Sequence, residues 1–161
     1  MVLPVLSERN GKPYPFLSTP FTETNGVFSP DGKWVAYHSN ESGRNEVYVR
    51  PFPGPGGVWQ ISAGGGMFPR WRADGKELYY LAPGNKLMAA AITAAPGTRP
   101  GAITPGQPAA LFTANFARGT ARPQYDVARD GRFLVNVELS DAATPPITLL
   151  QNWKQIGRAH V

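Results

Sequence analysis

The chain contains no cysteine and only two histidines among its 161 residues. The absence of cysteine excludes disulfide bonds, thiol chemistry and zinc sites built on cysteine. His38 is the only histidine outside the last six residues, and the sequence holds no cluster of carboxylates to accompany it. A metal site based on histidine needs several such ligands close together. We therefore expect neither a metal ion nor another cofactor.

Long apolar runs and concentrated charge are also missing. No stretch of about 18 apolar residues occurs, and no charged segment followed by an apolar one opens the chain. The net charge of +5 comes from scattered lysines and arginines, without a run of five basic residues. Binding of nucleic acid requires a concentrated basic face. We therefore expect no membrane insertion within this sequence and no nucleic-acid partner.

The signatures of common catalytic sites are absent as well. The sequence has no Gly-x-Ser-x-Gly elbow to expose a serine nucleophile, and it lacks the Gly-rich loop, His-Arg-Asp and Asp-Phe-Gly motifs of protein kinases. The glycine run at residues 64–66 is not followed by Lys-Ser or Lys-Thr, so it predicts a flexible connector rather than a phosphate-binding loop. We expect no catalytic residue here. Any kinase or peptidase domain would lie outside this sequence.

Turn-forming residues are abundant, with 18 glycines and 17 prolines, and they mark a repeat. The motif FSPDGKWVAY at residues 28–37 recurs as WRADGKELYY at residues 71–80 and as VARDGRFLVN at residues 127–136. Its aspartates are 43 and 56 positions apart, and an insert rich in Pro, Gly, Ala and Thr around residues 94–108 accounts for the longer interval. A period of about 43 residues is typical of four-stranded propeller blades.

Each copy of the motif contains a tight turn. In the first copy, Pro30 supplies the φ angle that a type I turn requires, and Gly32 supplies the positive φ that follows such a turn. Asp31 can accept hydrogen bonds from nearby backbone amides. The equivalent residues of the other copies are Asp74, Gly75, Asp130 and Gly131. One carboxylate per turn does not converge on a single point, so we assign these aspartates a structural role rather than a metal-binding one.

The strand after each turn carries large apolar groups on both faces. These strands, at residues 34–39, 77–82 and 133–138, do not alternate cleanly between polar and apolar positions. Such a pattern predicts burial on both sides, as in a blade packed between its neighbours. We therefore predict an all-β fold, a partial β-propeller of about three to three and a half four-stranded antiparallel blades. Its parts are a blade remnant at residues 1–20, blades at 21–63 and 64–113, and an incomplete blade at 114–155.

His38 and most of the tryptophans and tyrosines fall at positions where one blade packs against the next. His38 aligns with Leu81 and Val137, which predicts a buried or half-buried histidine with a local partner. The same reasoning assigns to the core most of the residues Trp34, Trp59, Trp71, Tyr79, Tyr80 and Trp153. Phe52, in the loop at residues 51–57, is the aromatic residue that we favour for contact with a ligand.

The last six residues, 156–161, are treated separately. Their sequence IGRAHV can be back-translated as ATCGGAAGAGCACACGTC, which resembles a common sequencing adapter. We expect this segment to be an artefact of assembly, so Arg158 and His160 carry no chemical argument.

The motif at residues 28–37 resembles the repeat of the TolB-like, or WD40-like Pro-Asp (PD40), β-propellers, and the other two copies are looser versions of it. The run at residues 40–57 and PITLLQNW at residues 146–153 resemble the C-terminal propeller of bacterial eukaryotic-like Ser/Thr protein kinases. In that family a cytoplasmic kinase and one membrane helix precede an exported propeller. The resemblance therefore implies a periplasmic or extracytoplasmic module that binds a protein, a peptide or a small ligand, as the sensing or interaction part of the kinase.

Two alternatives stay open, because the same repeats occur in other bacterial proteins. One is the propeller of a prolyl-oligopeptidase-like serine peptidase, which predicts a downstream hydrolase domain. The other is a free-standing TolB-type periplasmic scaffold protein, which predicts a signal peptide and no further domain. Propellers of the TolB type close with six or more blades, so the resemblance also implies a fragment cut at both ends.

Overall fold

A computed structural model describes residues 2–6, 13–95, 102–117, 122–138 and 147–150. Within these ranges the chain is all-β, with antiparallel strands and no helix, so none of the described segments is a helix that could cross a membrane. The strands are β1 (Val2–Leu6), β2 (Pro13–Ser18), β3 (Glu23–Phe28), β4 (Trp34–Ser39), β5 (Glu46–Pro51), β6 (Trp59–Gln60), β7 (Met67–Trp71), β8 (Glu77–Ala82), β9 (Lys86–Ala94), β10 (Ile103–Pro105), β11 (Ala109–Thr113), β12 (Tyr125–Val127), β13 (Phe133–Asn136) and β14 (Ile147–Leu150).

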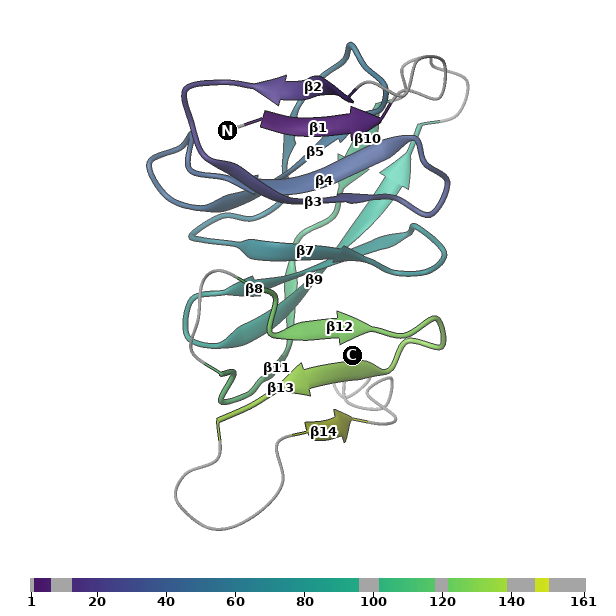
Figure 1. Ribbon diagram of the computed structural model, residues 1–161. Helices are drawn as coiled ribbons and strands as arrows, with labels where there is room; N and C mark the ends of the chain where they lie inside the picture. The colour runs from purple at the N-terminus through teal and green to yellow at the C-terminus, as the bar shows by residue number, and fades with distance from the viewer. Residues whose placement is uncertain (1, 7–12, 96–101, 118–121, 139–146, 151–161) are drawn as a thin grey trace.

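These strands form four antiparallel sheets stacked on one another (Figure 1). Sheet I is β1 with β2, and sheet II is β3 to β6 in sequence order. Sheet III is β7, β8 and β9, with both β10 and β11 paired to β9, and sheet IV is β12 to β14. The first strand of sheet III, β7, contacts β3, β4 and β5 of sheet II and β12 of sheet IV. Each sheet therefore packs against the sheet that precedes it in the chain.

Apolar side chains fill each space between successive sheets. Between sheets I and II the buried residues are Leu17, Tyr37 and Tyr48. Between sheets II and III they are Trp34, Ala36, Val47, Val49, Ile61, Trp71, Leu78, Tyr80, Ala90, Ile92 and Ile103. Between sheets III and IV they are Phe68, Tyr79, Leu87, Phe116, Tyr125, Phe133 and Val135. The aromatic residues expected in the core are confirmed there, except that Trp59 is half-buried and Trp153 lies outside the described residues.

Strands in the middle of the stack are buried on both faces, as the sequence predicts. Successive side chains of a strand point to opposite faces. Tyr37 accordingly packs toward sheet I, whereas Trp34 and Ala36 pack toward sheet III. In β8, Tyr80 faces sheet II and its neighbour Tyr79 faces sheet IV. All six residues of β4 are buried for this reason.

The prediction of burial on both faces is wrong for β13. Phe133 and Val135 are 0% and 2% exposed, but Leu134 between them is 48% exposed. The physical reason is that sheet IV packs on sheet III with one face only, and no described strand covers the other. The burial of a strand with this pattern thus depends on whether a second sheet is present.

The insert in the second interval between motif copies is partly a strand, so sheet III has five strands and not the four that the sequence predicts. β10 pairs with the end of β9, and Ile103 enters the core between sheets II and III. The beginning of β9 pairs instead with β11. Because β9 is nine residues long, its two halves can hold two different partners along one edge.

The first strands of sheets II and III share a bulge that the motif search did not predict. Asn25 and Phe68 both have positive φ, at 55° and 56°, and both lie where the register to the next strand shifts. They are 43 positions apart, the same interval as Asp31 and Asp74. A positive φ is unusual outside glycine, so its recurrence at one place in two sheets supports the repeat.

Candidate ligand-binding cleft

The three repeat turns share one hydrogen-bonding pattern. The glycine N–H donates to the carbonyl three residues earlier at 2.9 Å in each copy, in Gly32, Gly75 and Gly131. Their φ angles are 69°, 70° and 87°, which favour glycine. The carboxylate accepts the backbone N–H two residues later at 3.1, 3.0 and 3.1 Å, in Asp31, Asp74 and Asp130. The carboxylates therefore bind their own turns.

The charge state of the turn carboxylates follows from these bonds. Burial raises the pKa of Asp31, but the hydrogen bonds from the Ser29 hydroxyl (2.6 Å) and the Lys33 N–H outweigh burial and hold that pKa below its ordinary value. The backbone N–H of Arg132 is the largest cause of the lowered pKa of Asp130. Across the described ranges, no group of three or more His, Cys, Asp or Glu side chains is placed to hold a metal ion.

A cavity of about 840 Å³ lies beside the turns of sheets II and III, and its charges are largely paired. Arg72 contacts Asp74 at 3.3 Å and Glu77 at 3.2 Å. Asp31, on the other wall, already accepts two hydrogen bonds within its turn. These groups stabilise the turns, so this cavity offers a ligand few free hydrogen-bonding groups.

A second cavity, of about 580 Å³, lies at the opposite ends of the strands, and we call it the cleft. Four segments supply its walls: the β4–β5 turn, the β6–β7 connector, the β8–β9 turn and the segment before β12. Its lining residues are Arg44, Asn45, Gly64, Gly65, Gly66, Met67, Phe68, Leu81, Ala82, Pro83, Gly84, Asn85, Asn115, Phe116, Ala117 and Gln124. The cleft thus spans sheets II, III and IV.

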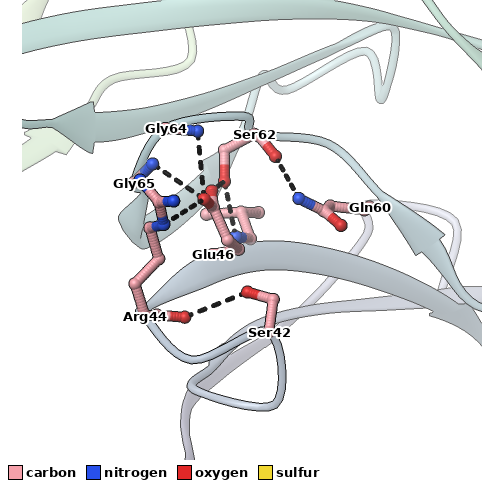
Figure 2. A network of polar contacts seen from close by, with 8 residues as sticks. Ser42, Arg44, Glu46, Gln60, Ser62, Gly64 and Gly65 are labelled. Atoms are coloured by element: carbon pink, nitrogen blue, oxygen red, sulfur yellow. Dashed lines mark hydrogen bonds and ion pairs between the residues drawn. The ribbon is translucent and has the colours of Figure 1, made fainter.

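One wall of the cleft is held in place by a buried carboxylate, Glu46, which is 2% exposed (Figure 2). Its Oε1 accepts the N–H groups of Gly64 and Gly65 at 3.0 and 2.8 Å. Its Oε2 accepts a hydrogen bond from the Ser62 hydroxyl, whose oxygen in turn accepts the N–H of Val47 at 2.8 Å. Glu46 begins β5, so it ties that strand to the connector that leads into sheet III.

The glycine connector is therefore pinned rather than flexible, and the sequence-based prediction is wrong on this point. Close packing adds to the hydrogen bonds. A Cβ on Gly65 would lie 2.7 Å from Pro83 Cγ, and one on Gly66 would lie 2.5 Å from Ser62 Oγ. Both positions thus require glycine because of what surrounds them. In other proteins, successive backbone N–H groups of this kind can bind a phosphate. Here the N–H groups of Gly64 and Gly65 already donate to the Glu46 carboxylate.

The polar groups on the cleft surface are one guanidinium and several carboxamides. Arg44 Nε lies 3.8 Å from Glu46 Oε1, and the Arg44 side chain is 66% exposed. Arg44 is the only charged residue in the lining. The carboxamides belong to Asn45, Asn85, Asn115 and Gln124. The Asn45 amide contacts Met67 Sδ at 3.2 Å, which places polar and apolar groups side by side.

Phe68, at the base of the cleft, connects three sheets through its backbone. Its N–H donates to His38 Nδ1 of β4 at 3.3 Å, and its carbonyl accepts the Tyr125 hydroxyl of β12 at 2.7 Å. Because a backbone N–H can only donate, His38 Nδ1 is unprotonated, and the Nε2–H donates to Thr24 Oγ1 at 2.7 Å. Burial lowers the pKa of His38 to about 4. The predicted buried histidine with a local partner is confirmed.

Phe52 does not face the cleft, and the expectation that it is poised for a ligand finds no support in its contacts. Its ring is half-buried and packs against Phe28, with centroids 4.8 Å apart, and against Phe16 at 5.5 Å. These contacts join the loop after β5 to β3 and β2. Phe52 therefore belongs to an intramolecular aromatic cluster.

Sequence reasoning missed the residues that build the cleft. Glu46 is a carboxylate at the start of an apolar strand, and such a residue followed later by a glycine run is a weak signal of a buried hydrogen-bonded acid. Arg44 carries no signal of its own. The lining comes from segments up to 80 positions apart, so only packing brings them together.

No protein-family model and no curated protein matches the chain. Among solved structures, the chain is similar to a crystal structure of a protein described as a candidate 6-phosphogluconolactonase from Bacteroides uniformis ATCC 8492, with 19% sequence identity and a TM-score of 0.48. The similarity covers 83% of this chain and 40% of that one. The chain thus spans less than half the length of that protein.

Proposed function

We propose that the chain is part of a β-propeller of the Pro-Asp repeat kind and acts as a non-catalytic binding module. The tandem arrangement is the observation that carries the proposal. Successive antiparallel sheets repeat one turn, and two of them repeat one bulge at an interval of 43 residues. The first strands of sheets II, III and IV contact one another in series, through β3, β7 and β12. In a propeller the corresponding strands of successive blades lie side by side around the axis.

The uncovered face of sheet IV adds support. Leu134 lies on the face of β13 opposite Phe133 and Val135, which pack on sheet III, and it is 48% exposed. An apolar side chain on this face fits a surface that a further blade covers.

The resemblance at residues 40–57 and 146–153 extends the proposal to a biological setting. We propose that this propeller is the extracytoplasmic sensing or interaction part of a membrane-anchored Ser/Thr protein kinase. The binding role is supported by the cleft, in which the Arg44 side chain is 66% exposed and contacts Glu46 through Nε. The loops at one end of a propeller bind unrelated ligands in different proteins of the same fold, so the fold alone does not identify the ligand.

Sequencing the genomic locus on both sides tests the proposal. We expect kinase motifs and one membrane-spanning segment upstream, and further Pro-Asp repeats beside this sequence. A downstream hydrolase domain with a Gly-x-Ser-x-Gly elbow, or a signal peptide with no other domain, would contradict the link to a kinase. The proposal of a propeller would still stand in either case. A locus without any further repeat would contradict the propeller itself.

A further inference from the structure

We propose that the cleft binds the C-terminal carboxylate of a peptide, with the Arg44 guanidinium as its anchor. This inference rests on the proposed function, because it names the ligand class of the same binding module. The cleft has one positive side chain and no acidic one in its lining, and the Glu46 carboxylate that lies 3.8 Å from Arg44 is buried behind the wall. An anionic group is therefore favoured at the Arg44 end, and only one such group can be neutralised.

Arg44 is arranged so that its outer nitrogens stay available. Glu46 contacts the guanidinium through Nε, at 3.8 Å, and holds it at the rim. The Glu46 carboxylate already accepts hydrogen bonds from Ser62, Gly64 and Gly65. Its hydrogen-bonding capacity is therefore met without the terminal nitrogens of Arg44. The two terminal nitrogens of an arginine form a planar fork that matches a carboxylate in two parallel hydrogen bonds.

The remaining surface selects a peptide carboxylate over a phosphate. A phosphate favours several cations or a row of backbone N–H groups, and the Gly64 and Gly65 N–H groups are taken by Glu46. Gln124 already binds Arg122 and Asn136, and the Asn115 amide nitrogen donates to the Glu138 carbonyl. The Asn85 carboxamide and Asn115 Oδ1 can instead exchange hydrogen bonds with the amide groups of a peptide backbone. Met67, Leu81 and Phe116 supply apolar surface for a side chain. A volume of about 580 Å³ lies within the usual range for a small-ligand site.

Peptide pools that differ only at the C-terminus test the proposal. The probes are N-acetylated tetrapeptides of mixed sequence with an apolar last residue, prepared as free acids and as C-terminal amides. Binding to the 161-residue chain is followed by titration, and its place by hydrogen exchange at the connector. We expect the free acids to bind at least about tenfold more tightly than the amides, and to protect residues 64–67.

Substitutions separate a specific anchor from a general effect. Arg44→Gln should weaken binding of the free acids by about tenfold or more, and Arg44→Lys should restore part of it, because lysine keeps the charge but loses the planar fork. Asn85→Gly removes one carboxamide and keeps a residue suited to the positive φ of 58°. It should weaken binding by a few-fold. Arg129→Gln, an exposed arginine outside the cleft, is the matched control and should change nothing.

Each other result would overturn the proposal. Equal binding of acids and amides, no binding of either pool, or unchanged binding in Arg44→Gln would remove the carboxylate anchor. If N-acetylated single amino acids bind as tightly as the tetrapeptides, the cleft takes a small carboxylate and not a peptide terminus. None of these results bears on the further repeats expected at the locus, so this proposal can fail while the propeller stands.

Discussion

Sheets II and IV carry the same turn motif but differ in how their second strands are buried. Val35 of β4 and Leu134 of β13 occupy equivalent positions in the motif, and they are 4% and 48% exposed. The turns before them share the bonds to glycine and aspartate, but the bond that closes the hairpin differs. The Ser29 N–H donates to the Trp34 carbonyl in sheet II, whereas the Ala128 N–H donates to the Arg132 carbonyl, one motif position earlier, in sheet IV. Val35 therefore pairs with Phe28, whereas Phe133 and not Leu134 pairs with Val127. The motif thus specifies the tight turn, while the strand register and the neighbouring sheets specify which side chains are buried.

The largest expected effect concerns two leucines in the second strands of their sheets, one buried and one half-exposed. Leu78 of β8 is 0% exposed, because it packs between sheets II and III. Leu78→Ala should lower the free energy of unfolding by about 2–5 kcal/mol, since it removes buried apolar atoms and leaves a cavity. Leu134→Ala should lower it by less than about 1 kcal/mol, because half of that side chain is already in water. Urea unfolding of both variants measures the two values.

The leucine comparison can also be sharpened with a longer chain. If a further sheet covers β13, Leu134→Ala should become as costly as Leu78→Ala in a protein that includes it. Similar costs for both variants in the present chain would contradict the one-sided burial of β13.

The second expected effect concerns pH, and it arises from the contact between sheets II and III. The pKa of His38 is about 4 in the folded protein and about 6.5 when unfolded. Between these values the unfolded chain binds more protons, so the free energy of unfolding should fall as pH falls from about 6.5 to 4. The total loss should be about 3 kcal/mol. It can be measured by urea unfolding over this pH range.

His38→Gln is the control for the pH prediction. Glutamine keeps a donor and an acceptor but does not titrate, so the difference in pH dependence between the two proteins isolates His38. Sheet IV has Val137 at the equivalent position and should contribute no such dependence. Parallel pH profiles for the two proteins would show that His38 is not held neutral between the sheets.

The smallest expected effect concerns the turns, in which sheets II and IV should behave alike. Gly32 has a φ of 69°, and a Cβ there would meet nothing within 4 Å. Gly32→Ala should therefore lower the free energy of unfolding by about 1–2 kcal/mol through backbone strain alone. Gly131→Ala should be at least as costly, because φ is also positive at 87°. Thermal or urea unfolding measures both, and a clearly smaller cost at Gly131 would show that the turns are not equivalent.

Most of the strands could be predicted from the sequence, and the site could not. The strand at residues 34–39 was expected with the bounds that β4 has, because the turn before it is specified by Pro30, Asp31 and Gly32. β10 was missed because Ile103 lies in a segment rich in Pro, Gly, Ala and Thr, and only pairing with β9 makes it a strand. The blade boundaries at residues 20, 63 and 113 fall in or next to connections between the observed sheets. The segment at residues 156–161 lies outside the described residues.

The sequence by itself determined the repeat, its tight turns and the apolar character of the strands that follow them. The turns depend on the φ angles and hydrogen bonds of neighbouring residues. Only the tertiary structure decided which strand faces are buried and what the glycine connector does. The role of Glu46 depends on Gly64 and Gly65, which lie 18 and 19 positions away. The cleft depends on the stacking of sheets II, III and IV. The sequence pattern that predicts strands and turns does not show which distant residues come into contact. Only the packing of the sheets therefore places Arg44 at the rim of a cleft.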